Sequence, residues 1–421
     1  MKKIARGALR TVLLLAVISS LLLSFNSCVE TDYVADRFDE YNISGFNKEK
    51  FKTVERIYRD YYVDDLPPSS ELVKETVDIY LEKYHEKIDT GDKSDLTEAL
   101  IKSYISAIGD KYSRYRTKEE YKSYDTNMSG TSYGIGVVVT YNTSDTSSLE
   151  ITTVYEDGGA YLAGVMVGDK IIEVNGETVS DIGYDRVADK IKGKENTTVN
   201  IKVLRGESEL SFTITRMPIV EKTVTYAIND DKIGYVAITS FKDNTYAQFK
   251  EAIAFLEDEG AIAIVYDLRG NPGGYLASVV NVLSHIAPSK TKIVSFSNNY
   301  AKPMKDNDSH SLSLPSVVLC DENTASAGEL FTSAMRDFDE EFGFFEVTIV
   351  GQTTFGKGIM QSTYKLGDGS TITLTVAYYN PPSGYNYHGV GITPDVFAED
   401  DTVDVDAQLI AAYQEALNLV K

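Results

Sequence analysis

The spacing of apolar residues along the chain changes period twice, and this limits the folds that the chain can adopt. Between residues 46 and 126 apolar residues recur at three- and four-residue steps, as in amphipathic helices. Between residues 127 and 217 the period shortens to two, with turn residues between the runs, which indicates a β-domain. From residue 221 to 400 strand-like and helical runs alternate, which indicates an α/β core. The sequence therefore predicts a multidomain α+β protein.

Residues 1–27 have the features of a secretory signal peptide. A basic start precedes an apolar run at residues 11–23, which is too short to span a bilayer comfortably. The run leads to Ser27-Cys28, which resembles a bacterial lipobox and implies lipidation of Cys28. That resemblance predicts a protein of the bacterial cell envelope, held on the membrane by Cys28 and facing the periplasm or the cell surface. The alternative is an ordinary secretory signal with an incidental Cys28. The polar residues 28–45 are predicted to form a tether.

Charge and cysteine content exclude several classes of protein. The formal net charge is −22, so the surface repels phosphate backbones and nucleic acid is not an expected partner. The second of the two cysteines, Cys320, lies in the apolar run SVVLC and is predicted to be a buried core residue. No disulfide framework is available if Cys28 is acylated. The four histidines are scattered, so no metal site and no cofactor are expected.

Two loops at strand-to-helix transitions could carry chemistry. The strand-like run AIAIVYDL is followed by a glycine-rich loop that includes Gly273 and Gly274, whose N–H groups could bind an oxyanion or a phosphate. A tight turn explains the same glycines equally well. The run SVVLC is followed by Ser326, which lies between two alanines where a helix begins. Ser326 could be an unobstructed nucleophile, and a helix N-cap is the alternative.

A third segment places a lysine between two glycines. Lys357 lies near Phe355, Ile359 and Met360, and burial among apolar groups would lower its pKa and allow the neutral amine to act as a base. Gln361 lies four residues further on and could hold that amine by a hydrogen bond. A phosphate-binding loop is the alternative, but the GxxxxGK[ST] pattern is not present here.

These three segments, in this order, resemble the motifs of the carboxyl-terminal processing peptidases, also called tail-specific proteases. The segments GDKYSRYRTKEEY (109–121) and HGVGITPDV (388–396) resemble two further motifs of that family. The resemblance implies a crotonase-like α/β serine protease core at 221–400, with Ser326 as nucleophile, Lys357 as general base and Gln361 as its positioning residue. It also implies an oxyanion hole formed by the N–H groups of Ala327 and of Gly273 or Gly274. Gly328 departs from the family, which often has serine there, and no catalytic atom is affected.

The middle region, residues 127–217, resembles a PDZ domain with a β-sandwich or barrel-like fold. AGVMVGDKIIEVNG matches a characteristic PDZ stretch. The segment Tyr133-Gly134-Ile135-Gly136-Val137 corresponds to the loop that receives a peptide C-terminus. Attached to a protease core, such a domain implies selection of unfolded or flexible C-terminal tails as substrates.

Other interpretations remain open at this stage. A Ser–His–Asp arrangement would need His388 or His285 as the base, although His388 lies in a segment that we interpret as structural and His285 on an apolar helix face. The chain could also be a catalytically inert PDZ-containing peptide-binding protein, or a phosphate- or acyl-thioester-binding enzyme. Self-association into a homo-oligomer is left open. Residues 401–421 are predicted to form a C-terminal helical tail.

Overall fold

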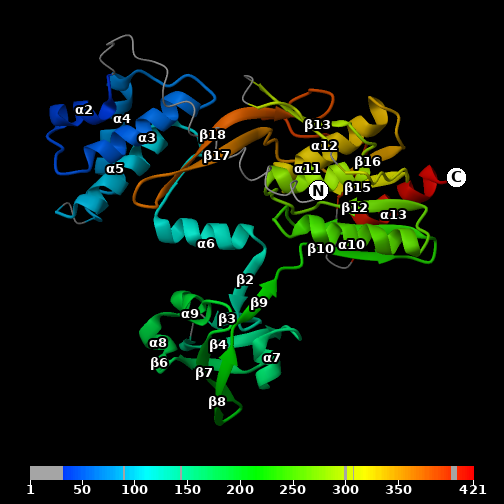
Figure 1. Cartoon of the computed structure of the whole chain (residues 1–421), viewed down its shortest axis with the longest axis horizontal. Coiled ribbons are helices and arrows are strands. Elements are labelled where there is room, and N and C mark those ends of the chain that lie inside the picture. The colour runs from blue at the N-terminus through cyan, green and yellow to red at the C-terminus, as the bar shows by residue number, and fades with distance from the viewer. Residues whose placement is uncertain (1–31, 89–90, 143–144, 298–300, 307, 400–404) are drawn as a thin grey trace, which may run out of the picture. The chain divides into compact units, whose positions relative to one another are not determined.

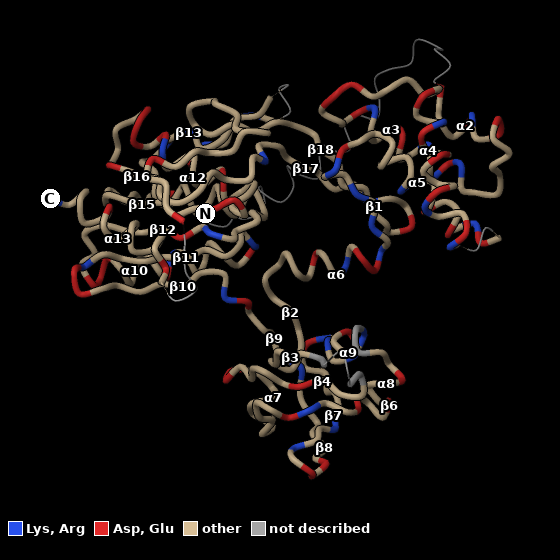
Figure 2. Tube along the Cα trace, turned by 180° about the vertical axis from the view of Figure 1, so that it is seen from behind, with Lys and Arg blue, Asp and Glu red and all other residues tan. Residues whose placement is uncertain are grey.

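The computed structural model describes residues 32–88, 91–142, 145–297, 301–306, 308–399 and 405–421. The predicted signal peptide and Cys28 lie outside these residues. The chain divides into two compact units, residues 1–55 with 67–108 and residues 56–66 with 109–421, and each is described by itself. Acidic and basic residues are interspersed along the described parts of both units (Figure 2). Among the described residues no helix is both long and apolar enough to cross a membrane.

The first unit is helical, as predicted. Its elements are α2 (Val34–Arg37), the 3-10 helix η1 (Phe38–Tyr41), the first part of α3 (Lys48–Tyr61), α4 (Ser69–Lys83) and α5 (Lys93–Ile108). The expected tether differs from what is observed, because Val34, Ala35 and Phe38 are buried. The buried carboxylate of Glu55 accepts hydrogen bonds from the N–H groups of Val34 and Ala35 at 2.7 and 3.1 Å. The polar composition of this segment concealed three residues that pack.

The β-domain in the second unit has the PDZ-like fold that the sequence predicts. Its strands and helices are β2 (Thr131–Gly134), β3 (Val137–Asn142), β4 (Asp145–Val154), α7 (Gly159–Ala163), β5 (Lys170–Val174), β6 (Glu177–Thr178), α8 (Val179–Ile182), α9 (Tyr184–Ile191), β7 (Thr198–Arg205), β8 (Ser208–Thr215) and β9 (Met217–Val220). The antiparallel sheet has the order β3-β4-β5-β7-β8, and β2 pairs with β9. Asn175 and Gly176 both have positive φ, 51° and 87°, as the predicted hairpin turn between β5 and β6 requires.

The core is a six-stranded sheet with helices on both faces (Figure 1). The strand order is β10 (Val224–Ile228), β11 (Ile233–Ile238), β12 (Ala263–Asp267), β15 (Ser316–Cys320), β16 (Val347–Gly351) and β19 (Val396–Phe397), and all neighbours except β10 and β11 run parallel. Helices α10 (Thr245–Asp258), α11 (Leu276–Ile286) and α12 (Ala327–Glu340) contribute to the larger apolar cluster on one face. The parallel strands β12, β15 and β16 are mostly apolar, as expected for a sheet that is buried on both faces.

The C-terminal helix α13 (Ala407–Leu419) covers the other face of this sheet. Ala412 and Ala416 are fully buried against Val265, Val317 and Leu319. The helix was correctly predicted, but it is a layer of the core and not a tail. The acidic residues before the helix suggested an exposed segment. The packing of the helix on the sheet depends on the small side chains of Ala412 and Ala416.

A second sheet lies beside the core, also within the second unit. It contains β1 (Arg114–Arg116), β18 (Thr371–Asn380), β13 (Lys292–Phe296) and β14 (Met304–Lys305), and β17 (Ile359–Lys365) pairs with β18. Helix α6 (Lys118–Met128) follows β1. The sheet matters for the site because β17 begins directly after the Lys357 loop, and β1 follows the segment GDKYS.

Candidate active site

The three segments that the sequence predicts to carry the chemistry lie at one edge of the parallel sheet. The strands β12, β15 and β16 are consecutive neighbours, and each segment follows the carboxyl end of one of them. Carboxyl ends of parallel strands lie at the same edge of a sheet, which is where binding sites form in open α/β folds. The order of the strands therefore brings the glycine loop, the Ser326 loop and the Lys357 loop together.

Ser326 occupies a sharp turn between β15 and α12. Its backbone has φ 56° and ψ −115°, in the region that residues with a side chain rarely adopt. Such a conformation costs about 1–3 kcal/mol and persists only where the surroundings impose it. Part of that constraint is visible, because the Ser326 N–H donates to Glu329 Oε2 at 2.9 Å. A strained serine at the end of a buried strand is typical of a nucleophile held out from the backbone.

Glu329 joins the serine loop to the lysine loop. Its side chain is fully buried in α12, and its Oε2 accepts hydrogen bonds from the N–H groups of Ser326 and Lys357, at 2.9 and 2.7 Å. Its Oε1 accepts from the Gly356 N–H at 2.6 Å and from Thr354 Oγ1 at 2.7 Å. Sequence reasoning did not select Glu329. The available signal was an acidic residue on the first turn of an otherwise apolar helix.

The amine of Lys357 is in an environment that favours its neutral form. Burial lowers the pKa of Lys357, and the nearby charges of Arg114 and Lys111 lower it further, against the opposing charges of Asp110 and Glu329. This bears on the predicted general base, since only an unprotonated amine can accept a proton. The Tyr379 hydroxyl fixes the lysine backbone by donating to the Lys357 carbonyl at 3.0 Å.

Ser326 and Lys357 lie on loops at one edge of the parallel sheet, whereas Gln361 lies in β17 of the second sheet. In the described part of the chain no hydrogen bond joins Lys357 Nζ to Ser326 Oγ or to Gln361. The Gln361 Nε2 instead donates to Thr375 Oγ1 at 3.4 Å. Burial raises the pKa of Tyr379, and its side-chain hydrogen bonds, first to Tyr387 and then to Ser326, oppose this rise. The predicted role of Gln361 thus stays a prediction.

The backbone donors of the predicted oxyanion hole are not equivalent. The Gly273 N–H already donates to Asn271 Oδ1 at 2.8 Å, so it does not point to a free site. Gly273, with φ 98°, instead allows the glycine loop to pack closely on the Ser326 loop. A Cβ at this position would lie 2.7 Å from Ser326 Cβ and 2.8 Å from the Ala327 nitrogen. Within the described residues neither Ala327 nor Gly274 has a backbone partner for its N–H. Those two donors fit the expected oxyanion hole better than Gly273 does.

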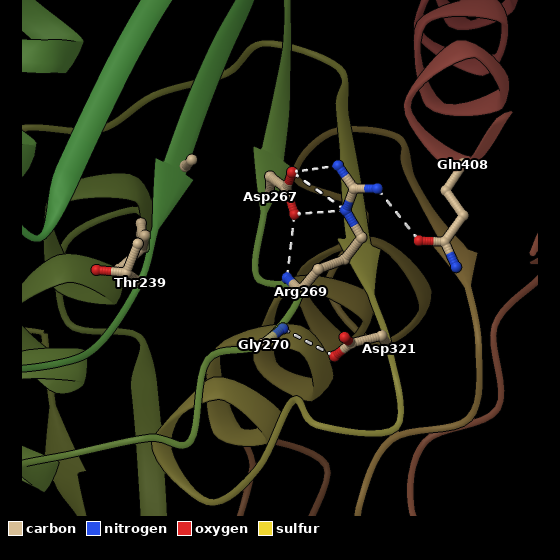
Figure 3. A pocket seen from close by; sticks show the side chains of 8 residues that line it. Thr239, Asp267, Arg269, Gly270, Asp321 and Gln408 are labelled. Atoms are coloured by element: carbon tan, nitrogen blue, oxygen red, sulfur yellow. Dashed lines mark hydrogen bonds and ion pairs between the residues drawn. The ribbon is translucent and has the colours of Figure 1, made fainter. Parts of the chain in front are cut away.

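Arg269 connects the start of the glycine loop to α13 (Figure 3). Its guanidinium donates to Asp267 Oδ2 at 2.8 Å, and to both Asp406 oxygens at 2.7 and 2.9 Å. Gln408 accepts from the same group at 3.2 Å. The adjacent Gly270 N–H donates to Asp321 Oδ1 at 2.9 Å, which ties the glycine loop to the serine loop. Asp267, Arg269, Gly270, Asp321 and Gln408 line a pocket, and their polar atoms stabilise the loop through contacts with one another.

The histidines do not form a catalytic triad with Ser326 in the described residues. His285 Nδ1 lies 2.8 Å from Asp308 Oδ2, and its ring stacks on His310 with 3.9 Å between centroids. His388 Nδ1 is buried and has no hydrogen-bond partner in the described structure. The segment after it supports the lysine loop, since the Gly389 N–H donates to the Gly356 carbonyl at 2.9 Å.

The described residues contain no second candidate site built on a cysteine nucleophile or on metal ligands. Cys320 is fully buried, as predicted, and burial raises the pKa of its thiol to about 12, so it is not a nucleophile. The described residues hold no group of three or more His, Cys, Asp or Glu side chains placed to bind a metal ion.

The predicted PDZ loop lies between β2 and β3. Ile135 is buried, whereas Tyr133 is 38% exposed. The Ile135 carbonyl accepts from the Ala160 N–H at 2.8 Å. Gly136 has φ 77°, and a Cβ there would lie 2.8 Å from the Cα of Gly158. Only glycine fits this turn, which packs closely on the segment before α7.

Comparison with known proteins agrees with this geometry. Residues 232–398 match the family described as "Peptidase family S41", and residues 150–205 match "PDZ domain". The chain is 34% identical over 316 residues to a probable CtpA-like serine protease of Staphylococcus haemolyticus, which covers 74% of this chain and 61% of the relative. It is 34% identical over 319 residues to the carboxy-terminal processing protease CtpA of Bacillus subtilis, covering 75% of this chain and 66% of the relative.

A third relative is matched over more of its length. The chain is 31% identical over 374 residues to a probable CtpA-like serine protease of Staphylococcus aureus, covering 86% of this chain and 68% of the relative. The chain thus spans 61% and 66% of the first two relatives and 68% of the third.

Glu329→Gln should loosen both loops. Glutamine keeps one acceptor oxygen and replaces the other by an NH₂ group, so two of the four donors lose their acceptor. At about 1–3 kcal/mol for each buried donor left unsatisfied, we expect the free energy of unfolding to fall by roughly 2–6 kcal/mol. Thermal denaturation should show a lower Tm, and hydrogen exchange should be faster at the amides of Ser326, Gly356 and Lys357.

Glu340→Gln is the matched control on the same helix. Glu340 lies 3.9 Å from Arg336, and its side chain is 64% exposed, so its loss should leave Tm and exchange unchanged. An E329Q protein that also keeps the wild-type Tm and exchange rates would contradict the role given to Glu329.

Proposed function

The chain belongs to peptidase family S41, and on that basis we propose that it is a serine endopeptidase of the carboxyl-terminal processing type. The observation that carries the proposal is the Glu329 carboxylate, which accepts hydrogen bonds from the N–H groups of both Ser326 and Lys357. A nucleophile on a strained turn and a lysine with a lowered pKa are thereby tied to one buried group. Exposed, flexible C-terminal tails of proteins are the proposed substrates.

The proposed reaction proceeds through an acyl-enzyme. The Ser326 oxygen attacks the carbonyl carbon of the scissile bond while the neutral Lys357 amine takes the hydroxyl proton. The N–H groups of Ala327 and Gly274 stabilise the oxyanion of the tetrahedral intermediate. Collapse expels the amine of the leaving fragment, which receives the proton from the Lys357 ammonium. Water then attacks the ester while Lys357 accepts one of its protons, and collapse breaks the bond to Ser326, whose oxygen receives that proton from the Lys357 ammonium as the carboxylic acid product is released.

Cleavage should depend on both Ser326 and Lys357. Ser326→Ala, Lys357→Ala and Lys357→Arg should each lower the cleavage rate of an unfolded test protein by about 10²–10⁴-fold or more, because Arg stays protonated and cannot act as a base. Since burial lowers the pKa of Lys357, wild-type activity should rise with pH through one ionisation below 10.5 and fall when the amine protonates at lower pH. Fragment mass spectrometry at several pH values measures both effects.

The control is Lys302→Ala, which removes an exposed lysine outside the site and should leave cleavage unchanged. His388→Ala should keep the chemistry in any variant that folds. A folded Lys357→Ala protein with near-normal turnover, or a folded His388→Ala protein that is inactive, would overturn the assignment of the base.

We infer that the PDZ domain selects substrates through their C-terminal carboxylate. The support is the match of residues 150–205 to the PDZ family, together with residues 133–137, which resemble the loop that receives a peptide C-terminus in such domains. Peptide binding to full-length Ser326→Ala protein should weaken at least about fivefold when the peptide C-terminus is amidated, since charge-assisted hydrogen bonds are lost. Fluorescence anisotropy with a matched acid and amide pair measures this. Equal affinities would exclude carboxylate recognition.

Lipid anchoring in the bacterial cell envelope is a separate proposal. It is supported by the basic and apolar residues 1–23 and by Ser27-Cys28. Cys28→Ala should move the protein from the membrane fraction to the soluble fraction after cell lysis, measured by immunoblotting, whereas Cys320→Ala should not. Retention of Cys28→Ala protein in the membrane fraction would contradict the lipid anchor.

A further inference from the structure

The Lys357 amine lies over an aromatic ring that the proposed reaction does not use. Its Nζ is 4.7 Å from the centroid of Tyr112, within the range of a cation–π contact. Tyr112 belongs to residues 110–113, here called the Asp110 turn, which precede β1. In the described residues no hydrogen bond connects that Nζ to Ser326 or Gln361. Among the described residues the Lys357 amine thus contacts the Tyr112 ring and makes no hydrogen bond to the nucleophile.

The Asp110 turn also contacts the residue that holds Gln361. Asp110 Oδ2 accepts from Thr375 Oγ1 at 2.7 Å and from Ser113 Oγ at 2.6 Å. Thr375 Oγ1 in turn accepts from Gln361 Nε2 at 3.4 Å. The Tyr112 N–H donates to Asp110 Oδ1 at 2.9 Å, which fixes the tyrosine within the turn. One short segment thus engages both Lys357 and, through Thr375, its predicted partner.

Several charged groups surround the Lys357 amine. Lys111 Nζ lies 4.9 Å from the Tyr112 ring and 5.6 Å from that of Phe355. Arg114 and Lys111 oppose protonation of Lys357, whereas Asp110 and Glu329 favour it. The ring of His388 lies edge-on to Tyr112, at 6.5 Å between centroids, and burial lowers the pKa of His388. β1 appears blue in Figure 2 because two of its three residues are arginine.

We propose that Tyr112 is a positioning residue that holds Lys357 in a resting place, away from Ser326, and that the amine must leave the ring before it can act as a base. This proposal rests on the proposed function. A ring face attracts the ammonium but not the neutral amine, so the contact holds the lysine in its protonated form and acts against burial, which favours the neutral form. A cation–π contact of about 0.5–2 kcal/mol corresponds to roughly a 2- to 30-fold preference for the resting place.

The test compares Tyr112→Leu with Tyr112→Phe in the full-length protein. Leucine removes the ring and keeps apolar bulk, so kcat on an unfolded test protein should rise about 3- to 10-fold at neutral pH. KM should change little, and the pH–rate profile should move to lower pH. Phenylalanine keeps the ring face and should behave as wild type. Tyr121→Leu is the control, because it removes another lysine–tyrosine contact, with Lys365 at 5.2 Å.

A folded Tyr112→Leu protein with unchanged or reduced kcat and an unmoved pH profile would overturn the proposal. A substrate-independent readout separates this from failure of the proposed function. The rate at which a fluorophosphonate modifies Ser326 needs no peptide substrate, and it should also rise in Tyr112→Leu. If no variant cleaves protein but this rate rises in Tyr112→Leu, the inference stands and the proposed function fails. If wild type cleaves protein and the rate of fluorophosphonate modification is unchanged in Tyr112→Leu, the proposed function stands and the inference about Tyr112 fails.

Discussion

Four hydrogen bonds converge on the buried Glu329 carboxylate, and they come from the two loops that carry the predicted nucleophile and base. An ionised carboxylate without partners inside a protein would cost several kcal/mol, so the loops and the carboxylate stabilise one another. The strained backbone of Ser326 can persist because its N–H is bound to this group. The sheet brings the two loops to the same edge, and Glu329 then fixes their separation.

The electrostatics of Lys357 follow from this arrangement. Glu329 lies near the amine and favours its charged form, yet burial is the larger influence and lowers the pKa. Much of the carboxylate charge is directed at backbone N–H groups and a hydroxyl, which leaves less of it to stabilise an ammonium. Arg114 and Lys111 act in the same direction as burial. An amine that is cationic in water is thereby shifted towards its neutral form, as the proposed base requires.

The sequence was sufficient for the parts of the site that depend on local pattern. Alternating strands and helices predicted the parallel sheet, and the residues after its strands made Ser326 and Lys357 candidates, which the family resemblance then selected. Contacts between residues that lie far apart in the sequence could not be predicted from local pattern. Glu329 looks like any acidic residue in a first helical turn, and only burial reveals its role. Gly273 was one of two glycines predicted as a donor, but its N–H already donates to Asn271 Oδ1. Tyr112 reaches Lys357 from a turn more than 200 residues earlier in the chain.

The central claim is that the folded protein holds Lys357 with a lowered pKa, so that its neutral amine is available at the pH of catalysis. Carbon-13 NMR of lysine Cε in selectively labelled protein reports this ionisation directly, with Lys357→Arg identifying the resonance. The account predicts that the Lys357 resonance titrates with a midpoint below 10.5, while exposed lysines titrate near that value. A midpoint at or above 10.5 in the folded protein would contradict the account.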